Sequence, residues 1–358
     1  MAQGATTENP NAKAALWLEA GRFYDQNKED DDRAIVYYER ALEINPGYLE
    51  ACRELGEIYF RNENWPEAGV CYRRVLDSIS PERDARDYAQ KNYRLGLINE
   101  KLGHPEHSVE YYQRAVDADP HYLMALEALV QSLITMEEWA DAKLATQQIL
   151  KEHADVLTIS EQVEFYAVLG DLCRNLKESD EARTAYSEGI ALDSNYGPAL
   201  KALAELELER DSFGNAVEYL SRYVHVAQLV DRCAIHEQVG ALRFSKLKDI
   251  PGSVVSYEHA SHLENATYET FENLAKSYLA AGKVDEAVEA MQKAIEAAPE
   301  RTMVSELYFH LAQIFLDHVE HEPRAIECFN SALDAAPTNI KAFEAIEKLL
   351  TERNEWTL

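Results

Sequence analysis

The chain has 358 residues, and its 64 Asp and Glu residues outnumber its 35 Lys and Arg residues, which gives a formal net charge of −29. Such an excess of negative charge repels a phosphate backbone, and we therefore expect no nucleic acid among the partners. Apolar residues make up 46% of the chain, which is enough for a hydrophobic core and excludes global disorder.

The N-terminal residues MAQGATTENPNAK lack the apolar segment of a secretory signal, and no later run is long enough to span a membrane. The five cysteines are scattered and form no CxxC pair. An odd, dispersed set is typical of small buried side chains in a reducing compartment rather than of a disulfide framework. The sequence therefore predicts a soluble cytoplasmic protein with no direct membrane insertion.

Along the chain, the same arrangement of small and aromatic residues recurs in segments that have helical periodicity. The first segment reads AGRFY at 20–24, and later ones read LGEIY at 55–59, LGLIN at 95–99 and LGDLC at 169–173. Aligned on these residues, the units start near 14, 49, 89, 123, 163, 197, 233, 268 and 305. Each unit predicts two helices joined by a short turn, which must stack on neighbouring units to bury their apolar faces.

Small residues mark the places where the two helices of a unit are expected to cross closely. The eighth position of successive units holds Gly21, Gly56, Gly96, Val130, Gly170, Ala204, Gly240, Ala275 and Ala312. A bulky side chain at such a crossing typically costs about 1–3 kcal/mol. We therefore expect wider crossings in repeats four and six, where Val130, Ile149 and Tyr223 stand in place of small residues.

Two units are followed by about six extra residues, near 77–88 and 151–162. Insertions of this size usually lengthen a helix or a loop and change the local curvature of a repeat array. Because neither insertion has the Gly, Ser and Pro content of a linker, we expect them to bend the array without splitting it.

The last segment, 340–352, predicts a lone amphipathic helix, because Phe343, Ile346, Leu349 and Leu350 share one face. Its eighth position holds Glu347 instead of a small residue, which suits a helix that no second helix covers. We expect this helix to cap the array.

The opening unit contains the motif Trp17-x2-Ala20-Gly21-x2-Tyr24, and the whole pattern closely resembles the tetratricopeptide repeat, a helix–turn–helix of 34 residues. The resemblance covers about residues 14–338. It implies an all-α fold, a right-handed superhelical solenoid of about nine repeats followed by a C-terminal capping helix. The expected organisation is a disordered tail over 1–11, the solenoid over 12–338, and the capping helix with a short tail over 339–358.

Catalytic signatures are absent from the sequence, which contains no HExxH, P-loop, GxSxG or GxGxxG motif. Three histidine pairs have i, i+3 spacing: His104/His107, His259/His262 and His318/His321. Short patterns of this kind are weak, and we interpret the pairs as exposed turn residues rather than metal ligands. The sequence therefore predicts no enzyme activity, no cofactor and no metal site.

The resemblance implies that peptides or partner helices bind in a concave groove lined by the first helices of the repeats. The family's carboxylate clamp for chaperone C-termini needs lysine, arginine and asparagine side chains. The nearest series here is Lys201, Glu205, Gln238, Glu269 and Asn273, so we expect no chaperone-tail binding. Over all repeats the groove positions are no more acidic than the chain as a whole, and a merely solvated acidic face remains an alternative.

Repeats six to nine give a more specific pattern, because acids predominate at their groove positions and Phe244, Leu279 and Phe309 project among them. Aromatic side chains surrounded by acids suit a partner segment that is basic and apolar. The residues predicted to contact this segment are Glu205, Glu209, Glu237, Phe244, Glu269, Glu272, Lys276 and Phe309.

The leading prediction is thus a non-catalytic scaffold or adaptor that binds a partner protein or peptide. The alternative is a self-associating structural component, a homo-oligomer or filament assembled through the ends or edges of the solenoid. A peptide-sensing regulator would need an effector domain and an enzyme a separate catalytic domain, and the repeats occupy nearly the whole sequence. Fold alone does not identify the partner.

Overall fold

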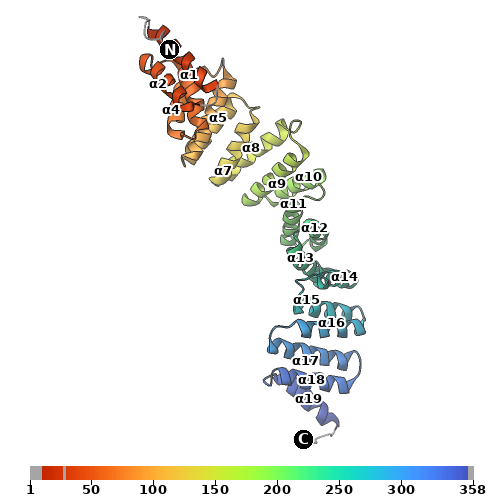
Figure 1. Cartoon of the computed structure of the whole chain (residues 1–358). Coiled ribbons are helices and arrows are strands. Elements are labelled where there is room, and N and C mark those ends of the chain that lie inside the picture. The colour runs from red at the N-terminus through yellow and green to blue at the C-terminus, as the bar shows by residue number, and fades with distance from the viewer. Residues whose placement is uncertain (1–9, 27–29, 354–358) are drawn as a thin grey trace. The chain divides into compact units, whose positions relative to one another are not determined.

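The computed structural model describes residues 10–26 and 30–353. Over these residues the chain forms nineteen α-helices and one π-helical turn, with no strand (Figure 1). The prediction of an all-α repeat fold is confirmed. Most of the tail expected over 1–11 lies outside the described residues, and α1 begins at Pro10.

The chain divides into two compact units, Met1–Glu188 and Gly189–Leu358, and the boundary falls inside α10 rather than at either insertion. The first unit contains α1 (Pro10–Gln26), α2 (Asp31–Ile44), α3 (Leu49–Arg61), α4 (Trp65–Leu76), α5 (Ala85–Lys101), α6 (Pro105–Ala118), α7 (Leu123–Thr135), α8 (Trp139–Glu152), α9 (Ile159–Asn175) and most of α10 (Ser179–Leu192). The second contains α11 (Gly197–Glu209), α12 (Phe213–Val226), α13 (Leu229–Leu242), the π-helical turn η1 (Arg243–Leu247), α14 (Ile250–Ser261), α15 (Tyr268–Ala280), α16 (Val284–Ala297), α17 (Arg301–Asp317), α18 (Glu322–Ala335) and α19 (Ile340–Arg353).

The helices pack in chain order as successive pairs, α1 with α2, α3 with α4, and so on to α17 with α18, and α10 packs on α9 through Tyr186 and Gly170. Within each unit, the second helix of one pair also packs on the first helix of the next, for example α4 on α5 and α14 on α15. Each repeat thus buries its apolar residues against both its partner helix and its neighbour, as a repeat array requires.

Glycine is required where a buried tyrosine covers the first helix. Gly96 lies beneath the ring of Tyr112, and a Cβ at this glycine would overlap the ring. The same relation holds for Gly21 under Tyr38 and for Gly170 under Tyr186. Because these rings are fully buried, they have no room to move away from an added methyl group.

The fourth repeat uses the opposite combination of sizes at the same two positions. Val130 occupies the glycine position, and the tyrosine position is taken by Thr146, whose hydroxyl donates to the carbonyl of Ala142 at 2.8 Å. Both side chains are buried, Val130 at 4% exposure and Thr146 at 0%. The larger side chain on α7 is therefore matched by a smaller one on α8.

In repeats two to nine, the turn between the two helices contains one residue in the left-handed conformation. These residues are Glu63, Gly103, Glu137, Lys177, Asp211, Lys248, Gly282 and Glu320, with φ between 54° and 75°. This conformation ends the first helix and lets the amide of the following residue bond back to it; after Glu137, for example, Glu138 N donates to Leu133 O at 2.9 Å. Six of the eight positions carry a side chain that disfavours the conformation.

Both insertions lengthen the helix that follows, as the sequence predicted. Helices α5 and α9 have 17 residues, whereas α3 and α7 have 13. A capping box begins α9, in which Thr158 N donates to the Glu161 carboxylate at 2.7 Å and Glu161 N donates to Thr158 Oγ1 at 3.3 Å.

The last helix, α19, packs on α18 through Ala342, Ile346 and Leu349. Phe343 was expected on this packed face, but the structure leaves it 59% exposed. Ile340, at the start of α19, is 68% exposed. The array therefore ends in a helix whose N-terminal turn presents two large apolar side chains to solvent.

Candidate interaction surface

The residues predicted from the sequence lie on the first helices of the second unit, α11, α13, α15 and α17, and in the adjoining turn η1. We refer to the surface formed by these helices and by α19 as the first-helix face. Helix α11 carries Glu205 and Glu209, α13 carries Glu237, η1 contains Phe244, α15 carries Glu269, Glu272 and Lys276, and α17 carries Phe309.

One cleft on the first-helix face lies between α11 and α13 and has a volume of about 300 Å³. Its lining residues are Lys201, Ala204, Glu205, Leu208, Leu220, Tyr223, Asp231, Ala234, Ile235 and Gln238. Leu220 and Ile235 are buried, whereas Lys201 and Asp231 are exposed at the margin. The cleft therefore combines an apolar base with charged margins. Of the eight contact residues predicted from the sequence, Glu205 lines this cleft.

A second cleft lies where α17 meets α19 and the turn before it, with a volume of about 430 Å³. Its lining residues are Thr302, Ser305, Glu306, Phe309, His310, Ala336, Thr338, Asn339, Ile340 and Lys341. Its wall is fixed by polar contacts, because Asn339 Nδ2 donates to Ser305 Oγ at 2.9 Å and Ser305 Oγ donates to Ala332 O at 2.6 Å. The Phe309 ring packs on Phe329, with ring centroids 5.6 Å apart.

Glu237 links two neighbouring repeats. Its carboxylate accepts a hydrogen bond from the hydroxyl of Thr270, which is fully buried on α15. The same hydroxyl accepts a hydrogen bond from Thr267 N at 2.9 Å, at the start of that helix. Glu237 thus links α13 to α15 through this hydrogen bond.

Glu272 lies between two basic side chains. Its Oε1 is 3.3 Å from His310 Nδ1 on α17 and 2.8 Å from Lys276 Nζ one turn further along α15. The contacts with His310 and with the neighbouring Lys276 lower the pKa of Glu272 to about 2, although partial burial opposes the shift. The negative charge of Glu272 is therefore largely balanced within the protein.

The remaining predicted residues are more accessible. Glu209 and Glu269 are exposed, and Glu269 Oε1 accepts from the hydroxyl of Tyr268 at 3.0 Å. Phe244 is half-buried in η1, where the side chain of Arg243 donates to Gly252 O and to Ser256 Oγ at 3.1 Å each. Sequence reasoning missed Asp231, Tyr223, His310 and Ile340, although the first three stand on helices whose repeat positions were already assigned.

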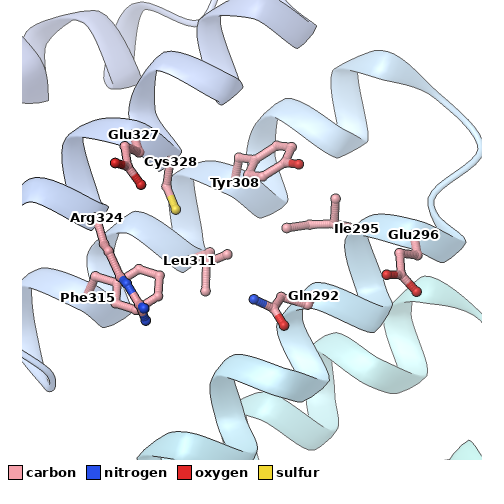
Figure 2. Close-up of a pocket in the computed structure, with 9 residues that line it drawn as sticks. All are labelled: Gln292, Ile295, Glu296, Tyr308, Leu311, Phe315, Arg324, Glu327 and Cys328. Carbon is pink, nitrogen blue, oxygen red and sulfur yellow. The ribbon is translucent and has the colours of Figure 1, made fainter.

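The opposite face, formed by the second helices, also contains a cleft. It lies between α16 and α18 with α17 beneath, and its volume is about 400 Å³. Figure 2 shows its nine lining side chains, among them Tyr308, Leu311 and Phe315 of α17. Burial raises the pKa of the Cys328 thiol in this cleft to about 11, so the thiol is protonated at neutral pH and is a weak nucleophile.

The first unit contains a larger cleft of the same kind, between α6 and α8 with Leu126, Leu129 and Leu133 of α7 at its base. Its volume is about 610 Å³. In the part of the chain that the structure describes, no helix combines the length and the apolar character needed to cross a membrane.

Comparison with known proteins gives consistent results for the family. Sequence models described as "Tetratricopeptide repeat" match residues 139–318, 28–90 and 90–122. The chain is similar to the human protein O-mannosyl-transferase TMTC3, with 22% identity over 290 residues, which is 79% of this chain and 30% of that protein. It is also similar to lipopolysaccharide assembly protein B of Escherichia coli strain K12, with 22% identity over 235 residues, 60% of each chain.

A third relative, the general transcriptional corepressor ssn6 of Schizosaccharomyces pombe, is 25% identical over 120 residues, or 34% of this chain and 10% of that protein. The chain thus spans between a tenth and three fifths of the length of these relatives.

Among solved structures, the tetratricopeptide repeat protein YrrB, described as having an unusual peptide-binding site, matches 57% of this chain and 98% of its own, with 16% identity and a TM-score of 0.41. The MamA protein matches 51% of this chain and 96% of its own, with 21% identity and a TM-score of 0.39. From the family match over half of its length, the chain belongs to the tetratricopeptide repeat family, whose members act as protein–protein interaction scaffolds.

Proposed function

We propose that this chain is a non-catalytic adaptor whose first-helix face, over repeats six to nine, binds a partner segment that is basic and apolar. The observation that carries the proposal is the presence of two clefts on this one face, each with apolar lining and acidic residues. Glu205 and Asp231 line the cleft between α11 and α13, and Glu306 lines the cleft between α17 and α19.

The two clefts suit different parts of such a segment. Leu208, Ile235 and Tyr223 offer an apolar base for an aliphatic or aromatic anchor, with acids at the margin for lysine or arginine. In the other cleft, Phe309 and the exposed Ile340 offer apolar contact area. Anchors that fill apolar pockets supply most of the binding energy, while charges at the margin mainly raise the association rate and select the partner.

The test is a binding measurement with fluorescent synthetic peptides that contain lysines and aromatic residues. We expect the full chain to bind them at low salt and Glu205→Lys/Asp231→Lys to bind about 10-fold more weakly, which corresponds to about 1.4 kcal/mol. The substitutions avoid Glu237, whose replacement would also break its contact with Thr270.

A matched control is Glu286→Lys/Glu289→Lys, which makes the same change in net charge at exposed positions of α16, a second helix. This variant should bind as the wild type does. Equal weakening in both variants would reduce the effect to net charge, and unchanged binding in the first variant would remove the cleft from the proposal. Peptides of the same charge without aromatic residues test the apolar contribution.

The non-catalytic part of the proposal rests on the absence of catalytic motifs from the sequence. One relative is named as an O-mannosyl-transferase, but the similarity covers only 30% of it. We expect no change in the mass of a serine- and threonine-containing peptide incubated with this chain and an activated mannose donor; a mannosylated product would contradict the proposal.

Self-association is the second candidate, and the exposed apolar residues at the start of α19 favour it. Ile340 and Phe343 are 68% and 59% exposed, and a repeat array can extend by stacking a further helix on such an end. Light scattering at two concentrations should then show a mass that rises with concentration in the wild type and stays monomeric in Ile340→Lys/Phe343→Lys. A monomer at both concentrations excludes this candidate.

A further inference from the structure

Three potential metal ligands from two neighbouring repeats meet at the C-terminal ends of second helices in the first unit. His121 lies in the turn between α6 and α7, Glu152 is the last residue of α8, and His153 follows it as the C-cap. One ring nitrogen of each histidine and one carboxylate oxygen of Glu152 all lie within 4.8 Å of one another. The histidine rings are 5.9 Å apart between centroids, at an interplanar angle of 74°.

The backbone around each residue is well determined by hydrogen bonds. His121 N donates to Asp119 Oδ1 at 3.2 Å in the turn after α6. His153 N donates to Ile149 O at 2.9 Å, and the carbonyl of His153 accepts from Val156 N and Leu157 N at 3.0 and 3.1 Å. The residues inserted after α8 thus fold into a turn at His153, and Leu157 in this turn belongs to the buried core.

His153 supplies an independent indication of a ligand. Its side chain is only 5% exposed, and its Nε2 has no hydrogen-bond partner among the described residues. Leaving a buried polar atom unpaired destabilises the folded chain, and most buried nitrogens have a partner. A metal ion bound to Nε2 would remove this penalty, because a neutral imidazole nitrogen is a strong metal ligand.

A second cluster of potential metal ligands in the described chain already contains a cation. Cys173, Glu178 and Glu181 also bring potential ligand atoms within 4.8 Å of one another. There, however, Lys143 Nζ lies 2.5 Å from Glu178 Oε2 and 2.6 Å from Glu181 Oε2. The ammonium group balances both carboxylates, so this second cluster has no need of a metal ion.

We propose that His121, Glu152 and His153 bind a divalent zinc ion. Two imidazoles and one carboxylate are a common ligand set for zinc sites that keep a fourth position open to water. Zinc–nitrogen bonds are about 2.0–2.1 Å long, and donor atoms that all lie within 4.8 Å of one another can reach one ion with small side-chain rotations. His121 and Glu152 are exposed and can rotate towards the buried ring of His153, which stays in place. The ion then links the C-terminal end of α8 to the turn between α6 and α7.

The site is missed by a search for short histidine motifs, because its two histidines belong to different repeats. The i, i+3 pair His104/His107 provides the matched control. Its rings are also 5.9 Å apart between centroids, at 70°, but both histidines are exposed and no third potential ligand joins them among the described residues.

The experiment is calorimetric titration of Zn²⁺ into the full chain, prepared without a histidine tag, compared with three variants. We expect one zinc ion per chain for the wild type. Loss of a group that merely supports a ligand weakens metal binding about 10–100-fold, so loss of a ligand in His121→Ala or His153→Gln should weaken it about 100-fold or more. The His104→Ala/His107→Ala variant should bind with wild-type affinity.

Thermal melting with and without Zn²⁺ keeps the test informative if the buried His153 cannot be replaced without loss of the fold. Zinc should raise the melting temperature of the wild type and of the control variant but not that of His121→Ala, in which only an exposed side chain changes. No saturable zinc binding by the wild type, wild-type affinity in His121→Ala, or loss of binding in the His104/His107 variant would each overturn the proposal.

Discussion

Each glycine beneath a buried tyrosine is one half of a pair of residues matched in size. Gly96 with Tyr112 and Val130 with Thr146 fill the same crossing in neighbouring repeats in opposite ways. The sequence indicated the small residues because they recur at a fixed position. The sequence did not indicate that Thr146 takes the place of tyrosine where Val130 takes the place of glycine. Recurrence of a residue type at one position carries no information about the residue that packs against it.

A double-mutant cycle tests this matching. Gly96→Val should destabilise the first unit by about 1–3 kcal/mol, because its side chain overlaps the Tyr112 ring. Adding Tyr112→Thr should recover part of the loss, so that the two changes are not additive. Thermal melting of the two single variants and the double variant measures the coupling; strict additivity would show that the two side chains do not compete for the same space.

The pKa of Glu272 predicts a dependence of stability on pH. Its pKa falls from 4.5 to about 2 in the folded chain, so the contact with His310 and Lys276 stabilises the fold fully above pH 4.5. That stabilisation is lost as the pH falls towards 2. Because Lys276 and His310 are 50% and 43% exposed, solvent screening reduces the contribution to about 1–2 kcal/mol.

Glu272→Gln should therefore lower the melting temperature at pH 6 and have a smaller effect near pH 2.5, where the wild type has lost part of the same contribution. Melting curves across this range measure the difference. Glu269→Gln, on the exposed part of the same helix, is the control and should have little effect at either pH. A difference that stays constant with pH would contradict the assignment.

The sequence could suggest Glu237 and Glu272 as groove residues but not their internal contacts. Thr270 and His310 belong to the next repeats, so side-chain hydrogen bonds between repeats decide which acids remain available. Glu205 lines a cleft, as expected of a groove residue.

At the scale of elements, the turns within repeats carry avoidable strain. Left-handed backbone costs a residue with a side chain about 1–2 kcal/mol, and glycine adopts it freely. Gly103 and Gly282 meet this requirement, whereas Glu137 and Lys177 do not. The sequence located these turns from the change of helical pattern, but acidic and basic residues give no signal for a left-handed conformation.

Glu137→Gly and Lys177→Gly should each raise the stability of the first unit by up to about 1 kcal/mol. The reverse changes, Gly103→Ala and Gly282→Ala, should lower stability by a similar amount, although a Cβ at either glycine would meet no atom within 4 Å. The effect therefore reports backbone conformation alone. Melting temperatures that stay unchanged in all four variants would show that these turns relax at no cost.

At the scale of the whole molecule, the family, the all-helical fold and the number of repeats follow from the recurring residues. The division at 188 and 189 was not expected, since it falls inside a helix that carries the regular Ala182 and Tyr186 pattern. Contacts between many residues define such units, and no single motif marks their limits.

Because each repeat contacts mainly its neighbours, the effect of a core substitution should remain local. Gly96→Val should speed hydrogen exchange in α5 to α8 and leave exchange in α15 to α18 at its wild-type rate. Mass spectrometry of exchanged peptides measures both regions in one experiment. Equal acceleration throughout would instead indicate that the whole chain unfolds as one cooperative unit.

The two clefts on the first-helix face have a consequence for the register of a bound chain. A surface that repeats evenly offers the same contacts at every step, and a partner segment could slide along it from one repeat to the next. The cleft with Tyr223 and the cleft with Phe309 differ in volume and composition, and the balanced charge of Glu272 lies on the helix between them. In the proposed complex, departures from the repeat, rather than the repeat itself, would provide the reference points that fix the position and direction of the partner.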